Sequence, residues 1–334
     1  MRVGMNPSRG KFTSYQPARV TIAVLVYIPH GTGYFEHRMN VLEACLTSIQ
    51  ANTQVPYDLL VFNNGSSPEV RAYLDGRQQD GAIQYLLHSQ KNIGKIGAFQ
   101  ILFRAAPGEI IAYADDDIYF FPGWLREHLR ILDAFPNVGM VSGCAVWGLF
   151  NEERISSNIS FVDEHPDAKM ERGRFIKDEW MQDWAESYGR DFETFKAETV
   201  DAEEIILDYH GVKTFAMANH NQFVIPKSVI SRCLPTDWTG RLMGLMDELD
   251  VAVNKAGYLR LSTFDRTTQH LGNALSPDFI RRFAIPVNLS ERIPDKYRDG
   301  SSARRIWRRF VMSRPVRWLL LGIYSRLFKL LNPE

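Results

Sequence analysis

Residues 109–125, EIIAYADDDIYFFPGWL, decide the fold class of this 334-residue chain. A β-rich apolar run ends in three consecutive carboxylates, Asp115, Asp116 and Asp117. Such a run is typical of a strand buried on both faces. Adjacent carboxylates disfavour burial unless a cation compensates them, and Mg²⁺ or Mn²⁺ takes carboxylate, phosphate and water oxygens. The stretch therefore indicates a divalent-cation site, with an acidic surface turn as the alternative, and the aromatic segment after it favours the site.

Strands and helices alternate on both sides of this stretch. Alternation of this kind predicts an α/β fold with a mostly parallel sheet flanked by helices. Ligands of such sheets lie beyond the carboxyl ends of the strands, where the loops 29–38, 63–67 and 114–121 would converge. The expected strands are 20–28, 57–62, 83–87, 109–113 and 138–142, and the expected helices are 39–51, 68–74, 97–106 and 124–135.

The second half of the chain is less regular. The segment 148–213 is rich in charged and aromatic residues, and we expect helices at 178–186 and 202–209. A short strand at 222–225 precedes a helix at 247–256, which Gly257 ends as its C-cap. A further strand follows at 258–262.

Composition excludes several classes of protein. The 39 basic and 39 acidic residues cancel, and 45% of residues are hydrophobic, so a disordered or a uniformly basic nucleic-acid-binding chain is excluded. Cys45, Cys144 and Cys233 form no CxxC motif, which argues against a disulfide framework or zinc site and fits a cytoplasmic setting. The apolar run 20–28 is only about nine residues long and lacks a small-residue cleavage site, which indicates a buried strand rather than a signal peptide. No stretch has the roughly 20 apolar residues of a spanning helix.

The charges are unevenly distributed along the chain. Residues 301–334 hold eight basic residues and one acidic residue, a net charge of +7, whereas the first 300 residues carry −7. Arginines alternate with Trp, Leu and Phe there, a pattern typical of a helix lying on an anionic membrane surface. We expect a flexible arm at 1–18 and a basic amphipathic helical tail at 276–334. The alternatives for the tail are a helix packed on the domain and an oligomer contact. Its many leucines argue against nucleic-acid binding by the tail.

Several motifs together resemble family 2 glycosyltransferases with the GT-A fold. The stretch 109–125 is similar to the family's strand, DxD motif and Pro-Gly-Trp-Leu, and FNNGS at 62–66 and NIGKIG at 92–97 resemble its nucleotide-side loops. MDELDVAVNKAGYLRLST at 246–263 resembles its acidic catalytic motif, helix and strand. The resemblance covers about 20–275 and implies a GT-A domain at 19–275. Its nucleotide-binding half would span about 19–145 and its acceptor half about 146–275.

The resemblance implies roles for individual residues. Asp115, Asp117 and His270 would bind Mn²⁺ or Mg²⁺. The nucleotide-sugar donor, with a UDP-sugar favoured, would contact Pro29, Asn63, Asn64, Asn92, Gly94, Lys95, Asp115 and Asp116. The family usually has an aspartate where this chain has Asn63 and Asn64, which leaves the nucleotide open.

The two acids that open the predicted helix 247–256 supply the expected catalytic base. The resemblance to the family's two-acid motif makes Asp247 or Glu248 the base that would deprotonate the acceptor hydroxyl, and it implies inversion at the anomeric carbon. Aligning the two-acid motif favours Glu248, and aligning by residue type favours Asp247. Asp250 would be structural or lie near the acceptor.

The resulting hypothesis is an inverting, metal-dependent hexosyltransferase peripheral to the cytoplasmic membrane face. Its acceptor would be a glycan or a lipid-linked glycan. A sugar nucleotidyltransferase and a catalytically silent, membrane-tethered scaffold are the alternatives. Oligomerisation stays open.

Overall fold

The structure is a computed structural model that describes residues 4–12, 14–236 and 246–283. The chain divides into two units, Met1–Leu275 and Ser276–Glu334. In the second unit the described part is helix α10 (Pro277–Phe283). The rest of the predicted amphipathic tail lies outside the described residues.

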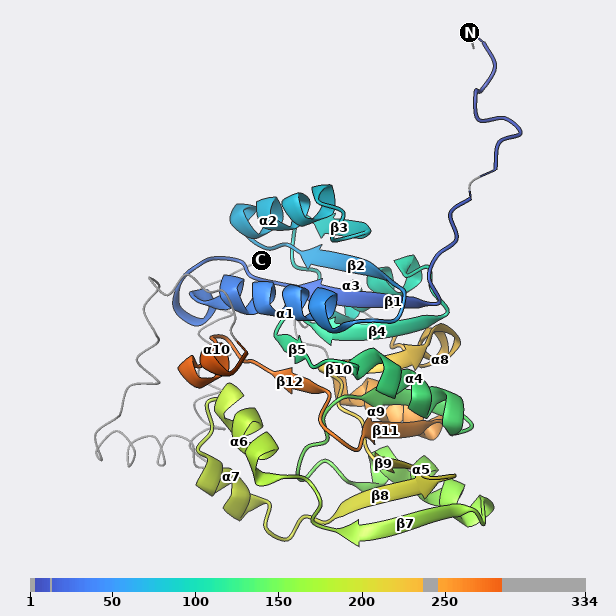
Figure 1. Ribbon diagram of the computed structural model, residues 1–334, viewed down its shortest axis with the longest axis vertical. Coiled ribbons are helices and arrows are strands. Elements are labelled where there is room, and N and C mark those ends of the chain that lie inside the picture. Colours follow the sequence, from blue (N-terminus) through green and yellow to red (C-terminus); the bar gives the residue numbers. More distant parts are fainter. Residues whose placement is uncertain (1–3, 13, 237–245, 284–334) are drawn as a thin grey trace. The chain divides into compact units, whose positions relative to one another are not determined.

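The first half of the sheet is parallel, as predicted. Strand β1 pairs with β2 on one side and β4 on the other, and β3 pairs with β2, all in parallel (Figure 1). In the β1–β4 register Leu25 lies opposite Asp115, so the acidic triplet lies at the carboxyl end of the sheet. These strands are β1 (Val20–Val26), β2 (Tyr57–Asn64), β3 (Tyr85–Ser89) and β4 (Ile110–Asp115).

The second half of the sheet mixes parallel and antiparallel pairs. The complete order is β3-β2-β1-β4-β10-β6-β11-β9-β8-β7. Strand β10 is antiparallel to both of its neighbours, β6 and β11 are parallel, and β9, β8 and β7 continue as an antiparallel extension. The bounds are β6 (Val138–Ser142), β7 (Ala168–Gly173), β8 (Glu204–Tyr209), β9 (Val212–Phe215), β10 (Gln222–Pro226) and β11 (Leu259–Thr263).

One predicted element is wrong. The segment 202–209 was expected to be helical, but Glu204–Tyr209 is the strand β8. Its β-branched pair, Ile205 and Ile206, suits a strand with a sheet neighbour on each side. A separate two-stranded sheet joins β5 (Ile118–Phe120) to β12 (Thr268–His270) in antiparallel pairing. This small sheet places the end of β12 beside the acidic triplet.

Helices cover both faces of the sheet. Apolar residues of α1, α2 and α4 pack in one core cluster, and those of α3, α8 and α9 in another. Alternate residues of β1 explain why its sequence is continuously apolar, since Ile22 and Val24 face the first cluster and Ala23 and Leu25 the second. The helices are α1 (Arg38–Asn52), α2 (Pro68–Gln79), α3 (Lys95–Ala105), α4 (Trp124–Ala134), α5 (Glu152–Glu164), α6 (Asp178–Ser187), α7 (Phe192–Glu198), α8 (Lys227–Cys233) and α9 (Met246–Lys255).

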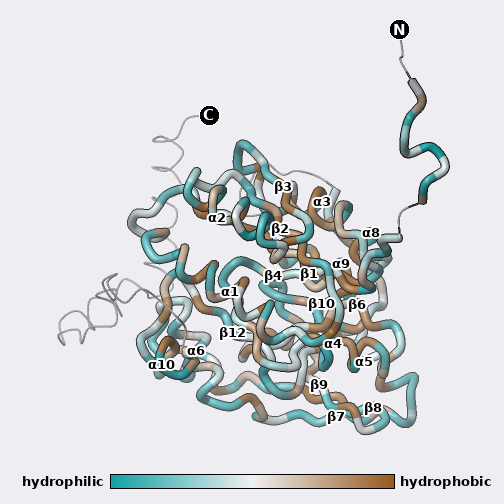
Figure 2. The backbone as a smooth tube through the Cα atoms, turned by 45° about the horizontal axis from the view of Figure 1, so that its top comes forward, coloured by the Kyte–Doolittle hydropathy of each residue, from teal (hydrophilic) through white to brown (hydrophobic). Residues whose placement is uncertain are grey.

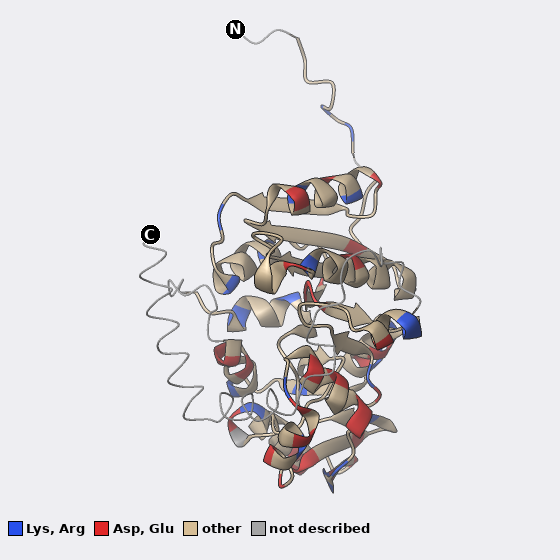
Figure 3. Ribbon diagram, turned by 90° about the vertical axis from the view of Figure 1, so that its left-hand side faces the viewer, with Lys and Arg blue, Asp and Glu red and all other residues tan. Residues whose placement is uncertain are grey.

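The predicted fold class is thereby confirmed as an α/β fold with a large central sheet flanked by helices. Figure 2 shows hydrophobic stretches along the core strands and hydrophilic ones in the connecting loops. Figure 3 shows acidic and basic residues interspersed over the covering helices, while the central strands are mostly free of charge. The three cysteines are free thiols.

Buried His128 on α4 makes stability dependent on pH. Its Nδ1–H donates to the Trp124 carbonyl oxygen at 2.7 Å, which leaves Nε2 to face the Gln222 amide nitrogen at 3.4 Å. Burial lowers the pKa of His128 to about 4, from an ordinary value of 6.5. The neutral imidazole is therefore the form that fits the fold.

We expect acid to destabilise the protein through His128. The unfolded chain takes up this proton near pH 6.5 and the folded chain only near pH 4, so stability falls as pH drops across this window, by about 3 kcal/mol. Urea unfolding at several pH values would measure it. The variant His128→Gln keeps an amide that can make both contacts, and its free energy of unfolding should vary less with pH. If the variation with pH were the same as in the wild-type chain, His128 would not be its cause.

Candidate active site

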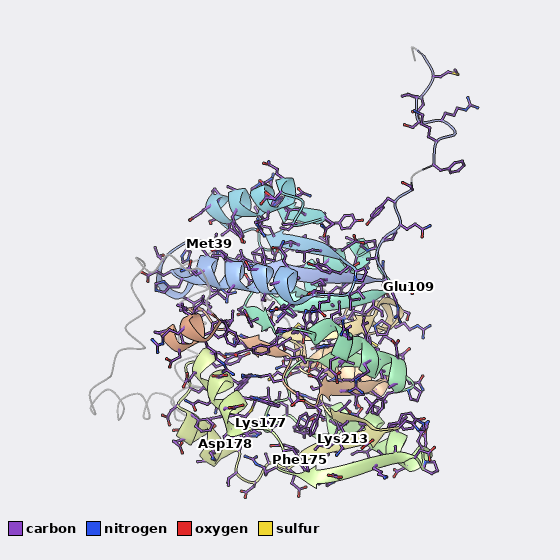
Figure 4. The ribbon with its side chains drawn as sticks, in the orientation of Figure 1. Met39, Glu109, Phe175, Lys177, Asp178 and Lys213 are labelled. Atoms are coloured by element: carbon purple, nitrogen blue, oxygen red, sulfur yellow. The ribbon has the colours of Figure 1, made fainter. Side chains whose placement is uncertain are left out.

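The acidic triplet lies where β4 ends and the turn to β5 begins. Figure 4 shows Glu109, just before β4, and Met39, in the first turn of α1, at opposite ends of this layer. The first turn of α1 therefore approaches the carboxyl end of β4. Arg38, the first residue of α1, therefore lies close enough to contact the triplet.

Arg38 is a buried cation between two of the three aspartates. Its Nη1 lies 2.8 Å from Asp117 Oδ2 and donates to the Gly272 carbonyl oxygen at 2.9 Å, and its Nη2 pairs with Asp116 Oδ1. Burial opposes the charge of Arg38, but Asp116 and Asp117 raise its pKa above the ordinary value. The sequence reasoning missed this residue, although the loop 29–38 that contains it was predicted to approach the site.

Asp116 is the most deeply buried member of the triplet. It is 6% exposed, and its second oxygen, Oδ2, accepts a hydrogen bond from the Tyr27 backbone N–H at 3.3 Å. Burial raises the pKa of Asp116 to about 6, and Arg38 opposes this shift. Both oxygens therefore have partners within the fold, as expected of a residue that anchors the loop.

Asp115 is compensated by Lys95, at the start of α3. Lys95 Nζ lies 2.7 Å from Asp115 Oδ1, which also accepts a hydrogen bond from the Tyr113 hydroxyl. The Lys95 side chain is 11% exposed, and its Nζ lies 5.7 Å from the centre of the Tyr113 ring. The lysine is thus a partner of the triplet and not a surface residue.

Asp117 is the member of the triplet with a free oxygen. Its Oδ2 contacts Arg38 and lies 3.4 Å from His270 Nε2, at the end of β12. Its Oδ1 is buried and has no hydrogen-bond partner among the residues described. Burial opposes ionisation here, but His270 and Arg38 outweigh it and hold the pKa of Asp117 below its ordinary value. A buried, ionised carboxylate oxygen without a partner is a fitting ligand for a hard cation.

His270 is held in an orientation suited to metal binding. The Ser187 hydroxyl donates to the Trp184 carbonyl oxygen at 2.7 Å, so at 2.8 Å it accepts from His270 Nδ1–H. In the neutral ring this tautomer leaves Nε2 as the basic nitrogen next to Asp117, whereas the imidazolium carries a proton there. The Tyr188 ring stacks on His270 with centroids 4.5 Å apart and planes at 9°. Ser187 and Tyr188 were not predicted as site residues, because the helix α6 that places them is distant in sequence.

The predicted metal-binding residues are thus only partly brought together. Asp117 and His270 adjoin, and their free atoms fit a divalent cation, whereas Lys95 and Tyr113 occupy Asp115.

The two asparagine-containing loops form a network with each other. Asn63 accepts from the Ser66 backbone N–H at 2.9 Å and contacts His88 at 3.0 Å. Asn64 donates to Asn92 Oδ1 at 2.9 Å, and the same oxygen accepts from the Gly94 N–H at 2.8 Å. The predicted donor residues therefore adjoin, but their side-chain amides bond within the loops. Pro29 is half-buried beyond β1.

The predicted catalytic acids open α9. The Asp247 side chain is 60% exposed, and its Oδ1 lies 2.9 Å from Arg154 Nη2, whereas Glu248 is exposed. Asp250 is buried, lies 2.7 Å from Arg260 Nη2 and contacts His220 Nδ1 at 3.0 Å. This buried, ion-paired position agrees with the expectation that Asp250 has a structural role.

A short turn, residues 219–221, connects the acidic triplet to the acidic residues of α9. The Asn221 carbonyl oxygen accepts from the Asp115 N–H at 2.9 Å, and the Asn221 side chain donates to the Tyr188 hydroxyl at 2.5 Å. The adjacent residue, His220, reaches Asp250. The turn 219–221 therefore joins the triplet to the catalytic-acid helix.

A second set of possible metal ligands lies in the same area. Ligand atoms of His220, Asp247 and Asp250 lie within 4.8 Å of one another. Arg154 and Arg260 already compensate the two carboxylates. The arrangement is that of an ion-pair network, and it needs no metal.

Comparison with known proteins agrees with the motifs of this site. Residues 34–183 match the family model described as glycosyl transferase family 2. The match includes Arg38, Lys95 and the triplet, and the resemblance inferred from the motifs is confirmed over these residues.

Individual relatives are distant. An uncharacterized glycosyltransferase of Rickettsia bellii (strain RML369-C) is 25% identical over 116 residues, which are 35% of this chain and 15% of that protein. Among solved structures, the mannosyltransferase PcManGT from Pyrobaculum calidifontis in complex with GDP-Man and Mn²⁺ is 16% identical, with a TM-score of 0.43 over 80% of this chain and 56% of that one. GalNAc-T7 with UDP, GalNAc and Mn²⁺ is 12% identical, with a TM-score of 0.47 over 88% and 48%. This chain therefore spans about half, or less, of these proteins.

None of the helices in the described residues is both long and apolar enough to cross a membrane.

Proposed function

We propose that the protein transfers a sugar from a nucleotide-sugar donor to an acceptor hydroxyl, in a reaction that needs a divalent cation. The observation that carries this proposal is the ionised, buried Asp117, whose Oδ1 has no partner among the described residues and which adjoins His270 Nε2. In a region that matches a glycosyltransferase family, this oxygen and this nitrogen are the proposed ligands of Mn²⁺ or Mg²⁺.

A bound cation would supply Lewis-acid stabilisation of the diphosphate as it leaves. Asp117 and His270 would hold it, while Ser187 fixes the His270 tautomer. Asp115 remains a proposed donor-side or metal residue, but Lys95 would have to shift for Asp115 to reach either. Lys95 is itself a proposed phosphate neighbour, because its ammonium lies at the edge of the triplet.

The donor would lie along the asparagine-containing loops. Pro29, Asn63 and Asn64 are proposed to line the base pocket, and Asn92 and Gly94 to lie near the ribose. Backbone groups are the proposed contacts, because the amides of Asn63 and Asn64 already bond within the loops. UDP is the favoured nucleotide.

We propose Glu248 as the base that accepts the proton of the acceptor hydroxyl, with inversion at the anomeric carbon. Glu248 is exposed in the first turn of α9, where the helix dipole favours an ionised carboxylate. The neighbouring acid, Asp247, has one oxygen engaged by Arg154, and this favours Glu248 over it.

The cellular setting is proposed from the sequence alone. The +7 charge of residues 301–334, with its aromatic and leucine side chains, supports a peripheral position on the anionic cytoplasmic face of a membrane. A lipid-linked or surface glycan is the acceptor that this position favours.

A donor screen tests the proposed reaction. Purified protein, Mn²⁺ and a panel of nucleotide sugars should release nucleoside diphosphate, and EDTA should abolish the release. Release of pyrophosphate from a sugar phosphate and a nucleoside triphosphate would instead identify a nucleotidyltransferase. Failure to bind Mn²⁺ or any nucleotide in calorimetry would favour a silent scaffold.

A further inference from the structure

Arg38 satisfies a need for positive charge that the acidic triplet creates inside the fold. Asp116 and Asp117 have side chains only 8% and 13% exposed, and the Arg38 side chain that contacts both is 6% exposed. Burying carboxylates is costly unless a cation and hydrogen bonds compensate them. Among the described residues that contact the triplet, Arg38 is the one whose side chain pairs with two of its members.

The geometry of Arg38 also decides which oxygen of Asp117 stays free. Nη1 occupies Oδ2, which leaves Oδ1 without a partner in the described part of the chain. The same Nη1 donates to the Gly272 carbonyl oxygen, two residues after His270. Gly272 has a φ of +73°, and a Cβ there would collide with the Ser187 backbone. One guanidinium therefore joins α1, the triplet and the segment that carries His270.

We propose that Arg38 is a built-in counter-cation of the metal site. It compensates the buried carboxylates while no divalent cation is bound, and because it occupies Asp117 Oδ2 it leaves Oδ1 as the oxygen open to a cation. This inference rests on the metal site of the proposed function. It implies that the site stays assembled without metal, at the cost of weaker metal binding, because a fixed positive charge repels an incoming cation.

The test compares Arg38→Gln with the wild-type chain in metal-free buffer and in a Mn²⁺ titration. Without metal, the Tm of Arg38→Gln should fall by on the order of 5–10 °C, because Asp116 and Asp117 lose their cation. Free Mn²⁺ measured by electron paramagnetic resonance should show binding about tenfold tighter than wild type. Saturating Mn²⁺ should therefore raise the Tm of the variant more than that of wild type.

Two further variants separate the effect of the Arg38 charge on Mn²⁺ affinity from a general loss of stability. Arg266 is a buried arginine, 5% exposed, that pairs with Asp183 at 2.8 Å. Arg266→Gln should lower the Tm without tighter Mn²⁺ binding. Arg38→Lys keeps the charge but loses the two-pronged contact, so its Mn²⁺ affinity should stay within about threefold of wild type.

Weaker or unchanged Mn²⁺ binding by Arg38→Gln would overturn the proposal, as would absence of binding by both proteins. If Arg38→Gln is not recovered folded, Arg38→Lys decides: a loss of affinity beyond tenfold would show that geometry, and not charge, is what Arg38 supplies. Nucleotide-sugar turnover by the wild-type protein is measured separately. Failure of the Arg38 proposal with turnover intact leaves the proposed reaction standing.

Discussion

Replacing Asp117 by asparagine is expected to lower kcat/KM for nucleotide-sugar turnover at least about a hundredfold. The side chain keeps its size, so the effect comes from the chemistry of its oxygens. Asparagine carries no charge, and an amide NH₂ placed at the buried Oδ1 position cannot bind a cation. Initial rates of nucleoside diphosphate release at saturating Mn²⁺ measure the effect.

A matched control is available on α4. Asp133 is exposed and pairs with Arg19, so Asp133→Asn should leave turnover within about twofold of wild type. If Asp117→Asn also kept wild-type turnover and metal dependence, Asp117 would not be a metal ligand. Recovery of activity at higher Mn²⁺ concentration would indicate weakened binding at the same site.

The second large effect is expected at the start of α9. Glu248→Gln should lower kcat about a hundredfold or more, because the amide cannot accept the acceptor's proton. Asp247→Asn should cost about tenfold or less, since Arg154 already occupies one Asp247 oxygen. Pre-steady-state measurement of donor cleavage with the acceptor present would separate the chemical step from product release.

The pair of variants also tests the assignment of the base. The reverse order, with Asp247→Asn severe and Glu248→Gln mild, would move the base to Asp247. Both variants should retain Mn²⁺ affinity, because neither residue contacts Asp117 or His270 in the described contacts. Loss of Mn²⁺ binding in Asp247→Asn would instead indicate that His220, Asp247 and Asp250 hold the metal.

The parallel half of the sheet was predictable because its strands are buried on both faces. The apolar runs of β1, β2 and β4 predict strands from the local sequence alone. The same holds for the start of α2 at Ser67-Pro68 and for the end of α9 at Gly257. The strand β8 was missed because IILDY has no clear alternation, and its identity comes from pairing with β7 and β9. The acidic triplet itself was located correctly at the end of β4.

The partners of the triplet were less predictable. Arg38 lies in a polar stretch that is typical of solvent-exposed loops, and its burial depends on the return of residues 270–273 to the site. The contact of Lys95 with Asp115 was not predicted, nor were the bonds that the amides of Asn63 and Asn64 make within their own loops. Such contacts connect residues tens to hundreds of positions apart, and no local pattern encodes them.

The most direct test of the metal site is anomalous diffraction from crystals soaked with Mn²⁺ and a nucleoside diphosphate. We expect a Mn²⁺ peak about 2–2.5 Å from Asp117 Oδ1 and within coordination distance of His270 Nε2. Arg38 should keep its contact with Asp116. A Mn²⁺ peak held by His220, Asp247 and Asp250, with none beside Asp117, would contradict this expectation.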